Sequence, residues 1–136
     1  NFIMKALERV PSSEGMLAMQ TINVTVLNRW FLGVFIGTAL ICLILAISAI
    51  VAWGAAHSPY VLGGAAAYIG GTWLVTALGN VPLNNKLQTL DVDAMNETSQ
   101  KIARKDFEPR WNLWNSIRAA FASLVSALLI ILLFIL

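Results

Sequence analysis

Apolar and charged residues are sharply segregated along this chain of 136 residues. The nine Lys and Arg and the seven Asp and Glu all fall within residues 5–29 and 86–118, so residues 30–85 carry none of them. Because about 20 apolar residues suffice to cross a hydrocarbon core of about 30 Å, the uncharged stretch is long enough for two membrane spans. The pattern therefore predicts an integral membrane protein.

A short turn separates these two spans. Gly54 and Pro59 interrupt the apolar run, and the flanking Trp53 and Tyr60 suit a lipid–water interface. A third apolar run closes the chain. We expect membrane helices at about residues 30–53, 60–82 and 114–136, with a loop at residues 84–113.

Both charged segments should lie on the same side of the membrane, because the chain crosses once at each span. All nine Lys and Arg residues belong to these two segments. An excess of Lys and Arg in short flanking loops marks the cytoplasmic side. We therefore expect a protein integral to the bacterial inner membrane, with its charged loops cytoplasmic and with the His57 turn and the C-terminus outside.

The first nine residues read as the end of a helix that is already under way. The chain begins at Asn1 without an initiator Met, and Lys5, Glu8 and Arg9 interrupt what a signal peptide would need as its apolar core. We interpret residues 1–9 as the end of a preceding span. The expected fold is one all-α domain over residues 1–136, a four-helix transmembrane bundle with three spans complete in this chain and the first largely missing.

Small residues on the two middle spans favour close packing between helices. Gly33 and Gly37 form a GxxxG match, and Gly63, Ala67 and Gly71 repeat at spacings of four along the next span. Membrane helices gain little hydrophobic free energy by leaving lipid for one another, so they associate where small residues let their backbones approach. We expect both stripes to lie at helix contacts.

Polar side chains near the ends of the spans need partners, because unpaired amides are costly in hydrocarbon. Thr76, Asn80 and Asn84 are spaced by four and should share one helix face. Pro82 lies inside that run and cannot donate to the carbonyl of Leu78, so the helix is expected to kink or end there.

Two further polar groups join the first at the cytoplasmic end of the predicted bundle. Helical spacing places Trp111, Trp114, Asn115 and Arg118 on one face, and Gln20 and Asn23 lie one turn apart on a lead-in helix. Such residues can simply cap helix ends and anchor them at the interface. Their convergence at one depth is also typical of a binding pocket, with amide donors and aromatic walls.

At these same residues the sequence resembles the anthrone oxygenase-like family of small membrane proteins, whose bacterial members mostly have no assigned function. The matching pieces are Met19-Gln-Thr-Ile-Asn23, Thr76-x-x-x-Asn-Val-Pro-Leu-Asn84 and Trp111-x-x-Trp-Asn-x-x-Arg118. Their order and spacing fit the family along essentially the whole chain. The family pattern begins with one more helix, which agrees with the expected preceding span.

The resemblance implies cofactor-independent oxidation of an aromatic enolisable ketone, as fungal members are associated with oxidising an anthrone to an anthraquinone. Arg118, Asn115 and Asn80 are then the expected oxyanion donors, and neither a cofactor nor a metal is expected. The expected substrate-binding residues are Gln20, Asn23, Thr76, Asn84, Trp111 and Trp114.

The sequence offers no base within this cluster. The substrate proton would have to pass to water, to a loop carboxylate such as Asp106 or Glu108, or be lost before binding. His57 on the outer turn and Cys42 in mid-span cannot form a multidentate metal site with each other.

A second class of function stays open, a non-catalytic accessory or scaffold subunit of a larger membrane complex. Its partners would be other membrane subunits or further copies of the chain, whereas the enzyme would bind an aromatic small molecule. Both would contact membrane lipid. Nucleic acid is not an expected partner, because the basic residues are interleaved with acidic ones instead of forming a stripe.

Overall fold

The computed structural model describes residues 2–135, and it contains helices and no strand over that range. In chain order the elements are α1 Phe2–Leu7, α2 Ser12–Val26, α3 Arg29–Val51, α4 Ser58–Tyr68, the π-helical segments η1 Ile69–Leu74 and η2 Thr76–Asn80, α5 Val81–Gln88, and α6 Glu97–Ile135. The all-α fold predicted from the sequence is confirmed.

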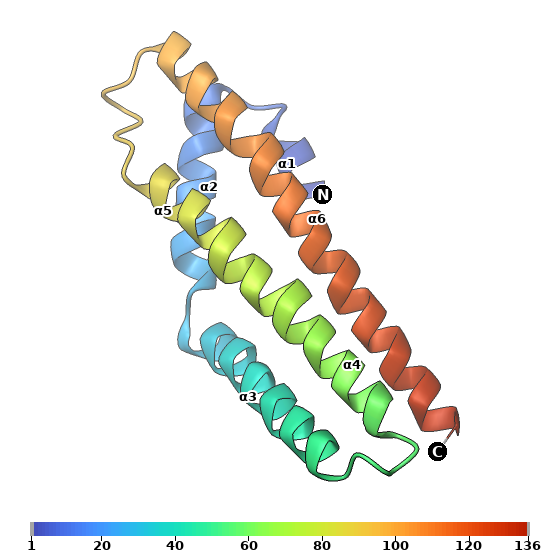
Figure 1. Cartoon of the computed structure of the whole chain (residues 1–136). Coiled ribbons are helices and arrows are strands. Elements are labelled where there is room, and N and C mark those ends of the chain that lie inside the picture. The colour runs from blue at the N-terminus through green and yellow to red at the C-terminus, as the bar shows by residue number, and fades with distance from the viewer. Residues whose placement is uncertain (1, 136) are drawn as a thin grey trace.

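Three helical stretches are long and apolar enough to cross a membrane, at Arg29–Val51, Ser58–Gln88 and Glu97–Phe134. The middle stretch runs from α4 through η1 and η2 into α5. Figure 1 shows this stretch between α3 and α6, and it contacts both of them. Each of the three expected apolar spans thus has a helix, as an integral membrane protein requires.

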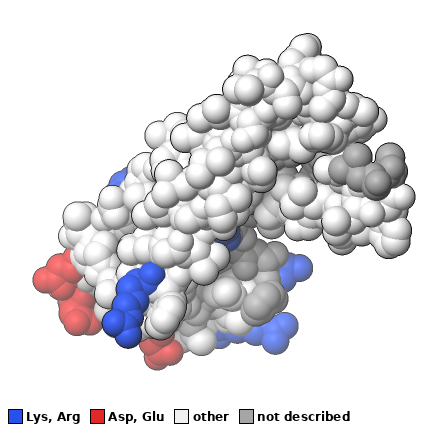
Figure 2. Space-filling view, turned by 90° about the horizontal axis from the view of Figure 1, so that it is seen from below, with Lys and Arg blue, Asp and Glu red and all other residues white. Residues whose placement is uncertain are grey.

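The charged segments gather at one end of the bundle. Figure 1 places α1, α2 and the connection between α5 and α6 at one end, and the turn between α3 and α4 at the other. In Figure 2 the Lys, Arg, Asp and Glu side chains lie together along one side of the visible face, and the remainder is uncharged. We call the end formed by α1, α2, α5 and the first half of α6 the charged end.

Helix α3 begins where a side chain satisfies its first free backbone groups. The Asn28 Oδ1 atom accepts hydrogen bonds of 3.0 Å from the backbone N–H groups of Trp30 and Phe31. Asn is among the residues preferred at this capping position. The observed start at Arg29 and end at Val51 lie within two residues of the predicted span.

Helix α6 begins much earlier than the sequence suggested. Residues 97–113 were predicted to belong to a loop, but they form the first part of this helix. Asn96 caps it by accepting a bond of 2.8 Å from the Ser99 N–H group, and Glu97 pairs with Lys101 one turn later. A capped start and i,i+4 ion pairs stabilise a helix without any apolar run, so hydrophobicity alone did not reveal it.

Of the two outcomes expected at Pro82, a kink or an end, the helix does not end there. The chain remains helical through this residue, because the π-helical segment η2 precedes it and the Val81 N–H group bonds to the Thr76 carbonyl five residues earlier. Pro82 then falls in the first turn of α5, where a missing N–H donor is tolerated. The wider turn absorbs the disruption that a proline causes in a regular α-helix.

A compact apolar core lies at the charged end. Its buried residues come from α1, α2, α5, α6 and the connection between α5 and α6, and they are Met4, Met16, Met19, Leu83, Leu87, Val92 and Phe107. Burying a side chain of this size contributes roughly 1.5–3 kcal/mol. This cluster fixes α2 against α5 and α6, and thereby sets one wall of the site described below.

The expected glycine packing is found at one of the predicted glycines, Gly71, and at Gly79, which was not predicted. A Cβ atom added at Gly33, Gly37 or Gly63 would meet nothing within 4 Å among the described residues, so these glycines make no close helix contact within the chain. The close approaches occur at Gly71, beneath the Phe121 ring, and at Gly79, beneath the Trp114 ring. The positions of large aromatic rings on α6 therefore determine which glycines form close helix contacts.

Arg104 ties the start of the chain to α6. Its guanidinium group donates to the backbone carbonyls of Leu7 and Val10 and pairs with Glu108 one turn later on α6. Gly15 leaves room for this group, since a Cβ atom there would lie 2.8 Å from an Arg104 nitrogen. Arg104 falls in the segment that was predicted to be a loop, but it lies in α6 and its side chain is largely buried, with 11% exposed.

Candidate functional site

A cavity of about 320 Å³ lies between α2, the start of α3, η2 with α5, and the middle of α6. Its volume is within the range of small-molecule sites in proteins. Seven of the nine predicted site residues line it, namely Asn23, Thr76, Asn80, Asn84, Trp111, Asn115 and Arg118. The tertiary structure thus brings together three segments that are far apart in the sequence.

The wall from η2 and α5 carries Thr76, Asn80 and Asn84, which were expected to share one helix face. A four-residue spacing drifts around an α-helix, because one turn holds 3.6 residues. The wider π-helical turn between Thr76 and Asn80 offsets this drift. All three side chains consequently reach the same cavity.

The wall from α6 carries Trp111, Asn115 and Arg118, at spacings that place them on one helical face. The Trp111 Nε1–H group donates to Asn84 Oδ1 at 2.9 Å, and the Asn80 amide nitrogen lies 3.4 Å from the Trp111 carbonyl. These two bonds join the walls of the cavity across the helix interface.

Three polar atoms of the cavity-lining residues are buried and have no hydrogen-bond partner among residues 2–135. They are Asn23 Nδ2, Asn80 Oδ1 and Arg118 Nε. The Asn23 and Asn80 side chains belong to residues that are only 6% and 5% exposed. Leaving such a group unpaired costs about 1–3 kcal/mol. The residues that line the cavity therefore include polar groups that the helix contacts leave unsatisfied.

Two predicted site residues lie outside the cavity. Gln20 was predicted to bind substrate, but its amide nitrogen donates to the carbonyls of Leu87 and Leu90 at 2.9 and 3.0 Å. It therefore satisfies backbone groups at the end of α5. Trp114 was assigned to the same face as Arg118, but its ring packs over Gly79 instead of lining the cavity.

The side-chain amides of two expected oxyanion donors, Asn80 and Asn115, already make contacts within the protein. The unpaired atom of Asn80 is its oxygen, and its nitrogen donates to the Trp111 carbonyl. The Asn115 oxygen accepts a bond of 2.6 Å from Arg118 Nη2. Asn115 thus orients the guanidinium group, and Arg118 Nε and Asn23 Nδ2 are buried donors without a partner among the described residues.

Most of the remaining lining is apolar. Seven residues that the prediction did not assign to the site complete the cavity, namely Ile3, Met19, Ile22, Val26, Leu27, Phe31 and Val81. Met19, Ile22 and Val26 follow helical spacing on α2, which would have placed them beside Asn23. No sequence signal marked Phe31, whose position depends on the sharp connection between α2 and α3.

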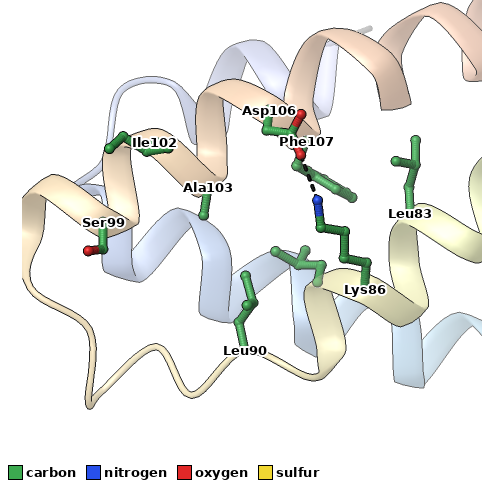
Figure 3. Close-up of a pocket in the computed structure, with 9 residues that line it drawn as sticks. Leu83, Lys86, Leu90, Ser99, Ile102, Ala103, Asp106 and Phe107 are labelled. Carbon is green, nitrogen blue, oxygen red and sulfur yellow. Dashed lines mark hydrogen bonds and ion pairs between the residues drawn. The ribbon is translucent and has the colours of Figure 1, made fainter.

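A second cavity, also of about 320 Å³, lies between α5 and α6 at the charged end. Figure 3 shows the Lys86 ammonium group directed at the Asp106 carboxylate across this cavity, and the two atoms are 2.8 Å apart. Lys86 lowers the pKa of the Asp106 carboxyl below its ordinary value through this hydrogen bond and charge. Asp106 is therefore held as a paired carboxylate outside the candidate site.

Among the described residues no group of three or more His, Cys, Asp or Glu side chains is placed to hold a metal ion. The cavity instead offers amides, two aromatic rings and one guanidinium group. This set of groups suits a flat, partly polar organic molecule. The rings provide stacking surfaces, and the amides and guanidinium fix oxygen substituents.

Comparison with known proteins finds one family. The profile of a family described as anthrone oxygenase matches residues 28–129, which is more than half of the chain. This range includes the polar segments of η2, α5 and α6 that line the cavity. No curated protein and no solved structure gives a significant match.

Proposed function

Since this chain belongs to the anthrone oxygenase family, we propose that it oxidises an aromatic, enolisable ketone with dioxygen in the cavity described above. The observation that carries the proposal is a cavity of about 320 Å³ whose lining includes three residues with a buried polar atom that has no hydrogen-bond partner among residues 2–135. A site that served only to hold helices together would leave fewer of its own polar groups without partners.

The proposed chemistry starts with the acidic methylene carbon of an anthrone. Loss of a proton gives an enolate, whose negative charge rests largely on the ketone oxygen. The enolate carbon then donates electrons to dioxygen and forms a carbon–oxygen bond, and the resulting peroxide takes up a proton. Cleavage of the oxygen–oxygen bond with loss of water gives the quinone, so one anthrone and one dioxygen yield one anthraquinone and one water.

The cavity residues have separate roles in this scheme. In the proposed scheme the Arg118 guanidinium and the Asn23 amide donate to the ketone or enolate oxygen, and the Asn80 amide oxygen accepts from a hydroxyl substituent. Donors that are already positioned stabilise a developing oxyanion without reorganisation at the moment of reaction. Trp111 and Phe31 supply aromatic surface for the ring system.

In the proposed orientation the charged end faces the cytoplasm of a bacterial cell. The basic residues gather at this end, as the positive-inside rule requires of a cytoplasmic side. The cavity then lies at the cytoplasmic boundary of the membrane, since α6 becomes continuously uncharged beyond Arg118. A lipophilic aromatic substrate reaches this depth from either the membrane or the cytoplasm.

Oxygen uptake by the purified protein with anthrone, measured against the same detergent without protein, tests the proposal. Replacing Asn80 by Leu keeps the side-chain size but removes the amide, and should abolish most of the uptake above background. Asn85→Leu is the matched control, because Asn85 is exposed and does not line the cavity. Equal uptake by the Asn80 and Asn85 variants would count against the site.

An accessory subunit of a membrane complex is the alternative function. It is favoured by the seam at Gly33 and Gly37, where an added Cβ atom would meet nothing within 4 Å among residues 2–135. A partner helix could approach α3 closely there. Two results together would support this alternative. The protein would show no oxygen uptake above background, and a partner protein would copurify with it but not with the Gly33→Leu variant.

A further inference from the structure

The candidate site contains a positive charge and no base. Arg118 has the one ionisable side chain among the fourteen residues that line the cavity from α1, α2, α3, η2, α5 and α6. The nearest charged residues on the other packed helices are exposed and do not line it: Lys5 on α1, Glu14 on α2, Arg29 on α3 and Lys86 on α5. Nothing on the cavity walls can therefore accept a proton from the substrate.

The charge of Arg118 is also uncompensated within the described residues. No carboxylate among the described residues lies within ion-pair distance of its guanidinium group. The four ion pairs within residues 2–135 involve other basic residues, namely Lys86, Lys101, Arg104 and Arg110. Its known partner is the neutral amide of Asn115, and its Nε atom has none. Arginine keeps its charge at any physiological pH, so the partly buried guanidinium favours an anion.

The two carboxylates that could have acted as bases are already engaged elsewhere. Asp106 pairs with Lys86 and lies near Arg110, and Glu108 pairs with Arg104. Asp106 also precedes Arg118 by twelve helical residues, a separation of about 18 Å along the axis at about 1.5 Å per residue. Of the three routes for the substrate proton, the loop carboxylates are thus the one that the geometry disfavours.

We infer that the cavity binds its substrate as an anion, the enolate or phenolate of a ring ketone, whose proton has passed to water rather than to a protein side chain. This inference rests on the proposed function and specifies the form of the substrate that the site selects. In the binding step an O–H or C–H bond breaks, the electron pair stays on the substrate, and no electron is transferred. Arg118 is then the residue that determines specificity for the charged form.

An opposite charge at about 4–6 Å lowers the pKa of an acid by about 1–3 units. The bound substrate should therefore ionise at lower pH than the free substrate. Catalysis needs no protein base in this scheme, because the protein shifts the acid–base equilibrium of the substrate toward its reactive form. A phenol that cannot be oxidised but carries a similar negative oxygen should experience the same shift.

The test is a spectroscopic titration of anthrone under argon, so that no oxidation follows ionisation. Enolate absorbance is recorded against pH with excess full-length protein in detergent and with detergent alone. The midpoint should fall by at least about one unit in the presence of protein. Arg118→Gln should return it to the value in detergent, whereas Arg118→Lys should keep much of the shift.

Arg110→Gln is the control, because Arg110 lies on the same helix but outside the cavity and is 60% exposed at its side chain. It should leave the midpoint where the unaltered protein has it. Binding is followed independently by quenching of tryptophan fluorescence, so that loss of binding or folding in a variant is detected separately.

The outcomes separate the inference from the proposed function. If anthrone binds but its midpoint is unchanged or rises, the cavity takes the neutral ketone and the inference is overturned, while the proposed site survives. If anthrone does not bind at all, the proposed function fails and the inference fails with it. A shift that disappears when anionic lipid is added would show that Arg118 pairs with a lipid phosphate instead, which also overturns the inference.

Discussion

The indole Nε1–H group of Trp111 donates to the Asn84 side-chain oxygen at 2.9 Å, and this bond joins α6 to α5 across the wall of the cavity. The two residues are separated by 27 positions in the sequence. Both line the cavity, so the bond contributes to helix packing and to the shape of the site at the same time.

Replacing Asn84 by Leu removes the acceptor and leaves the Trp111 N–H group without its partner. We expect the free energy of unfolding to fall by about 1–3 kcal/mol, because the donor is partly buried. Thermal unfolding in detergent, followed by tryptophan fluorescence, measures the effect. Asn85→Leu should change little, since Asn85 is exposed; equal losses in both variants would contradict this account.

The contact between Gly71 and Phe121 should make position 71 intolerant of any side chain. A Cβ atom there would lie 2.0 Å from Phe121 Cγ, whereas one at the adjacent Gly70 would meet nothing within 4 Å in the part of the chain that the structure describes. Gly71→Ala is expected to cost at least about 1–3 kcal/mol through overpacking, and Gly70→Ala should cost nothing comparable. Thermal unfolding of the two variants compares them directly.

A double variant tests the cause of that loss. Shortening Phe121 to Ala should restore part of the stability of the Gly71→Ala protein, because the added methyl group then has space. Additive losses in the double variant would show that the two positions do not interact.

We expect Gln20 to contribute to stability and not to oxidation. Gln20→Leu leaves the carbonyls of Leu87 and Leu90 without their side-chain donor, so the melting temperature is expected to fall. Oxygen uptake per folded molecule should persist, because Gln20 does not line the cavity. Gln88→Leu, at an exposed position of α5, is the matched control. If Gln20→Leu lost oxygen uptake while its melting temperature was unchanged, Gln20 would have to be part of the site.

Asp106 should be dispensable for oxidation. Asp106→Asn removes a carboxylate that is paired with Lys86 outside the candidate site, and oxygen uptake with anthrone should match that of the unaltered protein. A large loss of oxygen uptake in a folded Asp106→Asn protein would identify Asp106 as a base. It would contradict the inference that no protein side chain takes the substrate proton.

The pairing of Asp106 with Lys86 also predicts that the stability of the protein depends on pH. The Asp106 pKa is lowered in the folded protein by Lys86, so the carboxylate adds stability above its unfolded pKa and loses that contribution as the pH falls through the folded pKa. The difference in melting temperature between the unaltered protein and Asp106→Asn should therefore be present near neutral pH and disappear in strong acid. The difference should be small, because the pair is exposed.

Several features followed from local sequence alone. The three apolar spans, the common end of the charged segments and the helical face shared by Trp111, Asn115 and Arg118 agree with the structure. Each depends on hydrophobicity or on helical periodicity, which act over neighbouring residues. The family resemblance rested on the same polar motifs and is confirmed by the match over residues 28–129.

Other features depended on contacts between distant segments. Gln20 and Asn23 lie one turn apart on α2, yet only Asn23 reaches the cavity, because the end of α5 lies close enough to Gln20 to accept its hydrogen bonds. In the same way, Gly71 and Gly79 became the close-packed glycines because aromatic rings of α6 lie over them.

The sequence by itself determined that this chain enters a membrane as helices with its polar motifs at one end, because burial of apolar residues and helical spacing are local properties. Only the tertiary structure decided which of those polar side chains satisfy one another and which remain unpaired around a cavity. That outcome depends on how the helices approach each other, and the approach is set by pairs such as Phe121 with Gly71 and Trp111 with Asn84, whose members are far apart in the sequence.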